Sequence, residues 1–306
     1  MDSGQGRHSV IDTLLQQVSR IPLRFHRLSH QVRLGQHHSH QRGTGLDFEQ
    51  VKAYQAGDTI RTINWAATAR KGGETTLVNS YYEEKDLTIM LLVDLSASME
   101  FGSTRLTKQG LTAEISASLV YSARAAHDRI GLLGFASGVV GYLPPRQAKG
   151  YLRAIPEYIL HPHTDKGPAS FWTAVTSLER RLKHPALVFV LSDFLTQDLI
   201  SLRQALARLC RRHEPIALVV TDPLEVALPI GTTRIVTRDL ETDQVRSYSL
   251  TRANHQRMLA TGQARRAQLQ QMFRRLGIAY LTVTPHSPYG AEISQLFLTH
   301  HTRASA

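Results

Sequence analysis

The sequence predicts an α/β protein built on a doubly wound, mostly parallel sheet. From residue 86 onward, apolar strand-like runs alternate with helical patterns, as in chains that wind helices over both faces of a sheet. The runs TIMLLV (88–93) and ALVFVL (186–191) are continuously apolar, which is typical of parallel strands covered on both faces. With 306 residues, 42% of them hydrophobic, the chain can bury the core of one large domain or two smaller ones.

The expected elements follow in order along the chain. Residues 10–18 have the spacing of a short amphipathic helix, and residues 46–85 predict short strands separated by turns at AGD and KGG. We then expect strands at 86–96, 128–136, 138–144, 186–193, 215–222 and 277–285, helices at 104–126, 148–159, 169–183, 199–213, 251–276 and 290–299, and a hairpin arm at 239–250. Gly262 and Arg265 interrupt the apolar stripe of the helix at 251–276. We therefore divide the chain into an N-terminal helix and β-rich segment, 1–85, and an α/β domain, 86–306.

Charge and composition narrow the class of protein. The net charge of +11 is uneven, since residues 251–306 hold seven arginines and one acid, Glu292. This excess of positive charge favours acidic partners. A basic nucleic-acid-associated factor is the alternative function, although no nucleic-acid-binding module is recognisable.

Cys210 is the single cysteine, which excludes a disulfide framework, and the apolar runs are too short for a membrane span. Without a secretory signal pattern, we expect a cytoplasmic protein.

Three of the predicted strands end in an aspartate: Asp94, Asp193 and Asp222. In open α/β sheets, ligands bind beyond the carboxyl ends of the strands, near the point where the strand order reverses. These aspartates therefore stand where the fold class places its sites.

The stretch DLSAS places Asp94, Ser96 and Ser98 on alternate positions just after the first buried strand. Mg²⁺ prefers oxygen ligands, and two serine hydroxyls can ligate it without adding charge. With Asp94 and Asp193 acting directly or through water, a position would remain open for a partner's carboxylate. The competing interpretation is that these residues cap helices, with Ser103 or Thr104 starting the next one.

Enzymatic interpretations fit less well. The sequence lacks the P-loop pattern GxxxxGK[ST] and the nucleophile elbow G-x-S-x-G. A phosphatase with an aspartyl nucleophile would carry a second acid at position 96, which is a serine. We therefore expect a protein that is not an enzyme.

At this point the chain resembles known families. DLSASM after an apolar strand, with an SD-ended strand about a hundred residues on, is similar to the metal-ion-dependent adhesion site of von Willebrand factor A (VWA) domains. More specifically, LDFEQVKAYQAGDTIRTINWAATARKG (46–72), SYYEEKDLTIMLLVDLSASMEFGS, DRIGLLGF, LPPR and LVFVLSDF resemble the bacterial domain-of-unknown-function 58 (DUF58) family over residues 40–195. The family signature YxxGDxxRxIxW falls here on Tyr54, Gly57, Asp58, Arg61, Ile63 and Trp65.

The resemblance implies a VWA-like fold and a divalent metal, Mg²⁺ with Mn²⁺ or Ca²⁺ as alternatives. The metal ligands would be Asp94, Ser96, Ser98, Asp193 and a third-loop residue, for which Ser170 is the best match and Thr164 and Thr173 are the alternatives. It also implies a non-enzymatic protein-interaction module that works with a MoxR-type AAA+ ATPase in assembling or maturing protein complexes. Asn64 stands where the family usually has aspartate, and an ion-pair network of Asp58 with Arg61 or Arg70 is a further hypothesis.

Overall fold

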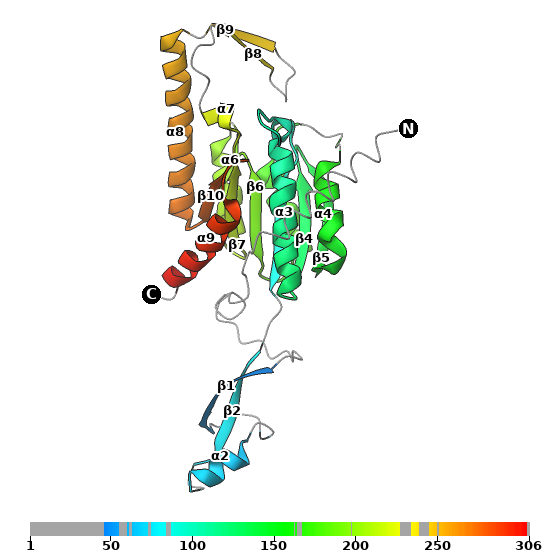
Figure 1. Cartoon of the computed structure of the whole chain (residues 1–306), viewed down its shortest axis with the longest axis vertical. Helices are drawn as coiled ribbons and strands as arrows, with labels where there is room; N and C mark the ends of the chain where they lie inside the picture. Colours follow the sequence, from blue (N-terminus) through cyan, green and yellow to red (C-terminus); the bar gives the residue numbers. More distant parts are fainter. Residues whose placement is uncertain are drawn as a thin grey trace. The chain divides into compact units, whose positions relative to one another are not determined.

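A computed structural model describes residues 46–54, 60, 63–72, 75–83, 87–161, 163, 167–196, 198–226, 234–238, 245–249 and 251–304 (Figure 1). The described residues form two compact units, one ending before Asp86 and one beginning at Leu87. The helix expected at residues 10–18, the residues Gly57, Asp58 and Arg61 of the family signature, and Thr164 lie outside the described residues.

The first unit is a two-stranded antiparallel sheet with a short helix. Strand β1 (Leu46–Ala53) pairs with β2 (Leu77–Glu83), with a bulge between Phe48 and Gln50. These strands were expected from the sequence, but the helix between them, α2 (Trp65–Arg70), was not. Its six residues are too few to show a helical period, so the sequence pattern could not indicate it.

Asn64 begins helix α2 and attaches it to the sheet. Its Oδ1 accepts a hydrogen bond from the backbone N–H of Ala67 (2.9 Å), and its Nδ2 donates to Oδ1 of Asn79 on β2 (2.8 Å). One turn later, the Thr68 hydroxyl donates to the carbonyl of Asn64 and accepts from the N–H of Leu77, both at 2.9 Å. The uncharged amide therefore serves as both a helix cap and a cross-link to β2.

The second unit contains a six-stranded sheet in the order β10-β7-β6-β3-β4-β5. Its strands are β3 (Thr88–Asp94), β4 (Arg129–Phe135), β5 (Val139–Gln147), β6 (Leu187–Ser192), β7 (Glu214–Val220) and β10 (Ala279–Val283). All neighbours are parallel except β5, which pairs antiparallel with β4 at one edge. The predicted fold class, an α/β, doubly wound and mostly parallel sheet, is confirmed.

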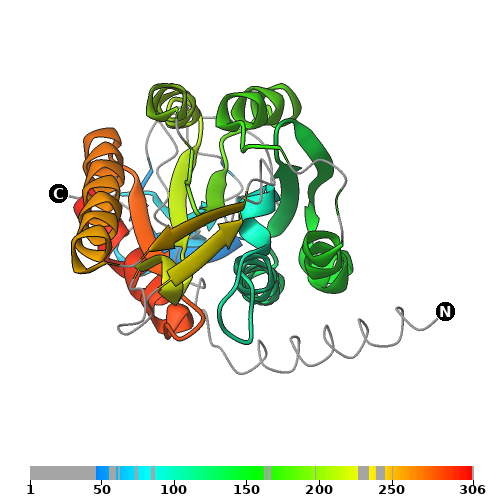
Figure 2. The same ribbon diagram turned by 90° about the horizontal axis from the view of Figure 1, so that it is seen from above.

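Helices cover both faces of this sheet (Figure 2). The long helices are α3 (Lys108–Ala125), α4 (Tyr151–Leu160), α5 (Phe171–Arg181), α6 (Leu199–Leu209), α8 (Arg252–Leu276) and α9 (Tyr289–Ala304), and α7 (Pro223–Val226) is a single turn. Helices α3 and α4 lie on one face, and α5 and α6 lie on the other. Helix α9 is attached to α3, because the Tyr289 hydroxyl donates to Glu114 Oε1 at 2.8 Å. No described helix combines the length and apolar composition that a bilayer crossing requires.

The burial of β3 and β6 in the core explains why their sequences are continuously apolar. Both are buried throughout, apart from partial exposure at Thr88. Met90 and Leu92 belong to a cluster with residues of helices α5, α6 and α8, among them Phe171, Val175, Leu178, Leu202, Leu206, Leu269 and Phe273. Side chains on successive residues of a strand point to opposite faces, so strands covered by helices on both faces must be apolar at every position.

Two boundaries differ from the expectation. Helix α3 begins at Lys108, where the Thr107 hydroxyl caps it by accepting from the N–H of Gly110 (3.0 Å), so neither Ser103 nor Thr104 starts it. The hairpin arm expected at 239–250 is β9 (Val245–Ser249), and its antiparallel partner is β8 (Arg234–Arg238), a strand that the sequence pattern did not indicate.

We predict that Asn64→Ala removes the cap of helix α2, whereas Asn64→Asp retains it. Loss of a helix N-cap costs about 1–2 kcal/mol, so opening of α2 should become about 5–30 times more frequent. The measurement is amide hydrogen exchange at Ala67, whose N–H is the capped donor. Asp retains the accepting oxygen and should protect this amide almost as well as Asn. Equal exchange in wild type and Asn64→Ala would contradict the assigned cap.

A second prediction concerns His213, which is 4% exposed and has both ring nitrogens buried without a hydrogen-bond partner among the described residues. Burial, with the nearby charge of Arg212, lowers the pKa of His213, although Glu179 opposes the shift. The folded protein therefore holds a neutral imidazole, while the unfolded chain takes up a proton as the pH falls below about 6.5.

The contribution of His213 to the free energy of unfolding should consequently decrease from pH 7 to pH 5, so the stability of His213→Leu relative to wild type should increase over this range. Urea denaturation at the two pH values measures it. An unchanged pH dependence in the variant would show that His213 does not contribute.

Candidate metal centre

The carboxyl ends of β3 and β6 lie side by side at the point where the strand order reverses. From β3 the chain continues to β4 and β5 on one side, and from β6 it continues to β7 on the other. The two strands are parallel and in register up to the pair Val93 and Leu191, so Asp94 and Asp193 leave neighbouring strands at the same edge of the sheet. This is the position at which α/β sheets of this type bind ligands.

Asp94 is 1% exposed and is held by neutral donors. Its Oδ1 accepts from the backbone N–H of Ser96 (2.9 Å), and its Oδ2 accepts from the hydroxyl of Ser192 on β6 (2.6 Å). Burial, and then the negative charge of Asp193, raises the pKa of Asp94 to about 7, although the hydrogen bonds from Ser192 and Ser96 oppose the shift. A positive charge near this carboxyl group would favour its ionised form.

Ser96 and Ser98 form a pair of hydroxyl groups beside Asp94. Their Oγ atoms are 3.2 Å apart. Ser96 precedes a short 3-10 helix, η2 (Ala97–Glu100), but its side chain makes no capping hydrogen bond to that helix. The capping interpretation therefore does not account for Ser96, and its hydroxyl is directed to Ser98.

Ser170 and Thr173 lie at the start of helix α5. The backbone N–H of Ser170 donates to the carbonyl of Ala136, just after β4, at 2.8 Å, which places Ser170 at the same edge of the sheet. The hydroxyls of Ser170 and Thr173 are 2.8 Å apart, and Ser170 does not cap the helix with its side chain. Two of the three candidates for the third loop, Ser170 and Thr173, therefore lie together at the start of α5, and the third, Thr164, lies outside the described residues. No hydrogen bond connects Ser170 with the other four predicted ligands among the described residues.

Asp193 is paired with a lysine that sequence reasoning missed. Nζ of Lys108 lies 2.6 Å from Oδ2 of Asp193 and 2.6 Å from Oε1 of Glu225 on α7. The Lys108 side chain is 2% exposed, and that of Asp193 is 3% exposed. Burial by itself would lower the pKa of Lys108, but the charges of Asp193 and Glu225 raise it above its ordinary value. The lysine is therefore a buried cation at the carboxyl edge of the sheet.

Asp222, the third strand-end acid, holds the loop that leads to α3. It accepts hydrogen bonds from the backbone N–H of Ser103 (2.7 Å), from the Ser103 hydroxyl, and from the N–H of Leu224 (2.8 Å). Burial by itself would raise the pKa of Asp222, but these hydrogen bonds and the charge of Lys108 keep it below its ordinary value. Asp222 is thus engaged with neighbouring loops.

Residues of helix α8 hold the loop that follows Asp193 in place. Phe194 has a left-handed backbone (φ 54°), which is uncommon for a bulky residue. Its ring stacks on Phe171 at the start of α5 and meets Phe273 of α8 edge-on. Arg265 of α8 donates to the carbonyls of Phe194 (3.1 Å) and Thr196. The arginine that interrupts the apolar stripe of this helix therefore holds the Asp193 loop.

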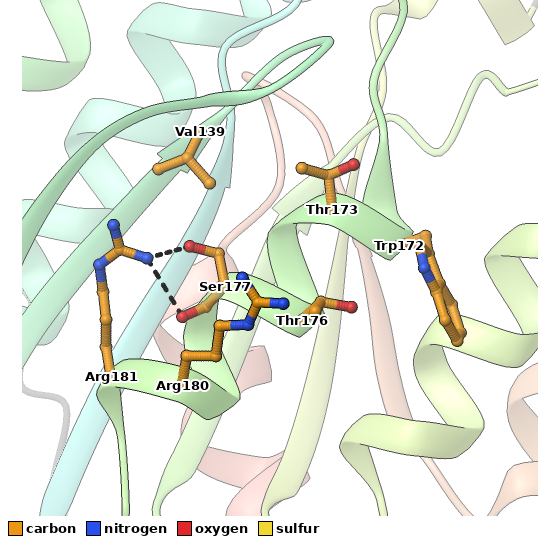
Figure 3. A pocket seen from close by; sticks show the side chains of 7 residues that line it. All are labelled: Val139, Trp172, Thr173, Thr176, Ser177, Arg180 and Arg181. Carbon is orange, nitrogen blue, oxygen red and sulfur yellow. Dashed lines mark hydrogen bonds between the residues drawn. The ribbon is translucent and has the colours of Figure 1, made fainter.

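A groove of about 500 Å³ runs along helix α5 beyond Ser170 (Figure 3). The residues that line it are Val139, Trp172, Thr173, Thr176, Ser177, Arg180 and Arg181. Arg181 donates to the carbonyl of Ser177 (3.3 Å) and lies over the Tyr142 ring, whereas Arg180 is exposed and has no ion-pair partner among the described residues. Among the described residues, the groove is therefore lined by two arginines and by no acidic side chain.

The residues at the sheet edge fit a hard divalent cation. All of the predicted ligands offer oxygen, which Mg²⁺, Mn²⁺ and Ca²⁺ accept. Asp94 and Asp193 are buried carboxyl groups on neighbouring strand ends, and burial followed by the charge of Asp193 raises the pKa of Asp94, so a cation would stabilise the pair. No cluster of three or more His, Cys, Asp and Glu with metal-binding geometry occurs among the described residues, so a metal here would depend on the serine hydroxyls.

Comparison with known proteins supports the family resemblance. Residues 50–269 match the model of the family described as protein of unknown function DUF58. An uncharacterized protein of Mycobacterium tuberculosis is 27% identical over 256 residues, which are 82% of this chain and 78% of the relative.

Two solved structures give further alignments. The hypothetical protein BatB from Bacteroides thetaiotaomicron aligns at 15% identity with a TM-score of 0.45, over 71% of this chain and 99% of BatB. The VWA domain of SpRpn10 aligns at 12% identity with a TM-score of 0.39, over 69% of this chain and 95% of that domain. Because the DUF58 model matches residues 50–269, well over half of the chain, the chain belongs to the DUF58 family.

Proposed function

We propose that this protein is a non-enzymatic protein-interaction module that binds a carboxylate of its partner through a divalent cation. The observation that carries the proposal is the pair of buried carboxyl groups, Asp94 and Asp193, on neighbouring strand ends, with the hydroxyls of Ser96 and Ser98 beside Asp94. Membership of the DUF58 family and the VWA-like arrangement of the sheet support the same function.

Asp94, Ser96, Ser98, Ser170 and Asp193 would hold the ion, with Thr173 as an alternative to Ser170. Mg²⁺ is the expected ion, and Mn²⁺ or Ca²⁺ would suit the same oxygen donors. When bound, it would supply positive charge for an incoming carboxylate. A hydrolytic role has little support, because the Ser96 and Ser98 hydroxyls contact each other rather than a histidine that could act as a base.

The groove on α5 supports an acidic partner. Thr173 belongs both to the groove and to the hydroxyl pair with Ser170, so the basic surface begins next to the proposed metal ligands. Arg180 and Arg181 lie about two turns further along the same helix. A partner whose carboxylate reached the metal could place further acidic side chains against these arginines.

The proposed partner is a MoxR-type AAA+ ATPase, in keeping with the family resemblance, and the joint function would be the assembly or maturation of protein complexes.

A nucleic-acid-associated role is the second candidate, and the arginine-rich C-terminal region motivates it. Arg265, however, is engaged in holding the Asp193 loop, so part of this arginine excess has a structural role.

We expect Asp94→Asn to weaken Mn²⁺ binding by more than about tenfold, since even the outer partners of metal ligands contribute about 10–100-fold. Titration of Mn²⁺ into the full chain, followed by electron paramagnetic resonance, measures the affinity, and competition with Mg²⁺ extends it to the expected ion. Glu157→Gln, at an exposed ion pair on α4, is the matched control. Equal affinity in wild type and Asp94→Asn would refute the metal centre.

Binding of the MoxR-type ATPase from the same organism should require Mg²⁺ and should weaken in Arg180→Glu. The charge reversal repels an acidic partner, and the effect should diminish at high salt because exposed charges are screened. Co-purification with Mg²⁺ or with EDTA tests both claims, and Arg124→Glu on α3, on the opposite face of the sheet, is the control. Binding that persists in EDTA and in Arg180→Glu would exclude this mode of recognition. Salt-sensitive binding of duplex DNA without ATPase binding would favour the nucleic-acid alternative.

A further inference from the structure

Lys108 stands where a lysine is unfavourable for two reasons. Its side chain is 2% exposed, and a buried ammonium group loses its hydration. It is also the first residue of α3, and the N-terminus of a helix repels positive charge. Stability of α3 therefore does not explain this residue. The compensation comes from Asp193 and Glu225, each with an oxygen 2.6 Å from Nζ.

The two carboxyl groups of the candidate metal centre consequently differ. Asp193 uses Oδ1 to accept from the N–H of Leu195 (3.0 Å) and Oδ2 to pair with Lys108. The hydrogen bonds of Asp94 come from neutral donors, the N–H of Ser96 and the hydroxyl of Ser192. Among the described residues, a cationic side chain thus pairs with Asp193 and not with Asp94.

We infer that Lys108 is a tethered cation that competes with the divalent metal for Asp193 and thereby limits how tightly the centre binds metal. The inference rests on the proposed metal-dependent function. An ammonium group and a metal ion attracted to the same carboxylate repel each other. A unit charge within about 4–6 Å shifts a neighbouring ionic equilibrium by about 1–3 powers of ten, so Lys108 should weaken metal binding by at least about tenfold.

Glu225 is the second carboxylate that pairs with Lys108. Its side chain is 26% exposed, and it contacts Nζ through Oε1 while Oε2 accepts from the N–H of Asp222 (3.3 Å). When a metal binds the Asp193 carboxylate, the ammonium group of Lys108 keeps Glu225 as its counter-ion, so the buried cation is not left unpaired. Without Glu225 the ammonium would depend on Asp193 alone and would compete more strongly.

The two residues therefore predict opposite effects. In Mn²⁺ titrations of the full chain, Lys108→Gln should bind at least about tenfold more tightly than wild type, and Glu225→Gln should bind more weakly. The glutamine side chain of Lys108→Gln would retain an N–H donor for Asp193 but no charge, and Lys149→Gln, at an exposed lysine, is the matched control. In thermal unfolding, Mg²⁺ should raise the Tm of Lys108→Gln more than that of wild type, because the metal would replace the missing cation.

The outcomes separate this inference from the proposed function. If wild type and folded Lys108→Gln bind Mn²⁺ equally, the inference is overturned and the metal centre remains. If Lys108→Gln binds Mn²⁺ while wild type does not, the inference is supported and the metal dependence of the natural protein is refuted. Binding by neither protein overturns both. Should Lys108→Gln fail to fold, Glu225→Gln decides, and an affinity equal to or tighter than that of wild type overturns the inference.

Discussion

The parallel pairing of β3 with β6 is the constraint on which the rest of the structure depends. Both strands are buried on both faces, so they can carry polar residues only where the sheet ends. At that edge the chain brings two carboxyl groups together with low exposure, an arrangement that costs free energy unless charge and hydrogen bonds offset it. The Ser192 hydroxyl, the amides after each strand and the Lys108 ammonium group provide this compensation. Buried polar groups thus gather where two largely apolar strands end.

The sequence was sufficient to predict the sheet and to place acidic residues at its carboxyl edge. Continuous apolar runs identified the buried strands, and the rule that ligands bind beyond their carboxyl ends drew attention to three strand-end acids, Asp94, Asp193 and Asp222. Helix boundaries were less accurate, because local patterns do not reveal which hydroxyl will cap. Thr107 begins α3, while Ser103, four residues earlier, is engaged by Asp222 from a strand far away in the sequence.

The residues that were missed have in common that a distant partner determines their role. Lys108 precedes Asp193 by 85 residues and Glu225 by 117, and a lone lysine at the start of a helix gives no local signal of either contact. Arg265 appeared only as a break in an apolar stripe, and its role follows from its hydrogen bonds to the loop after Asp193. Asn64 departs from the family pattern by losing a charge, yet its amide donates to Asn79 in a way that an ionised carboxylate cannot. The roles of these residues could therefore be assigned only once the fold had brought their partners close.

Strand β5, at the edge of the sheet, has a consequence for how any protein can dock. An exposed edge strand ordinarily offers its backbone to another chain, which can extend the sheet by one strand. In β5, Pro144 and Pro145 lack N–H groups, and the carbonyl of Pro144 already accepts from the hydroxyl of Tyr151 (2.9 Å). These two prolines reduce the backbone groups that β5 can offer to an added strand, which disfavours β-strand addition and edge-to-edge aggregation at this part of the edge. Any recognition at these residues would therefore rely more on side chains, whose identity can select one partner among many, than on a backbone that all chains share.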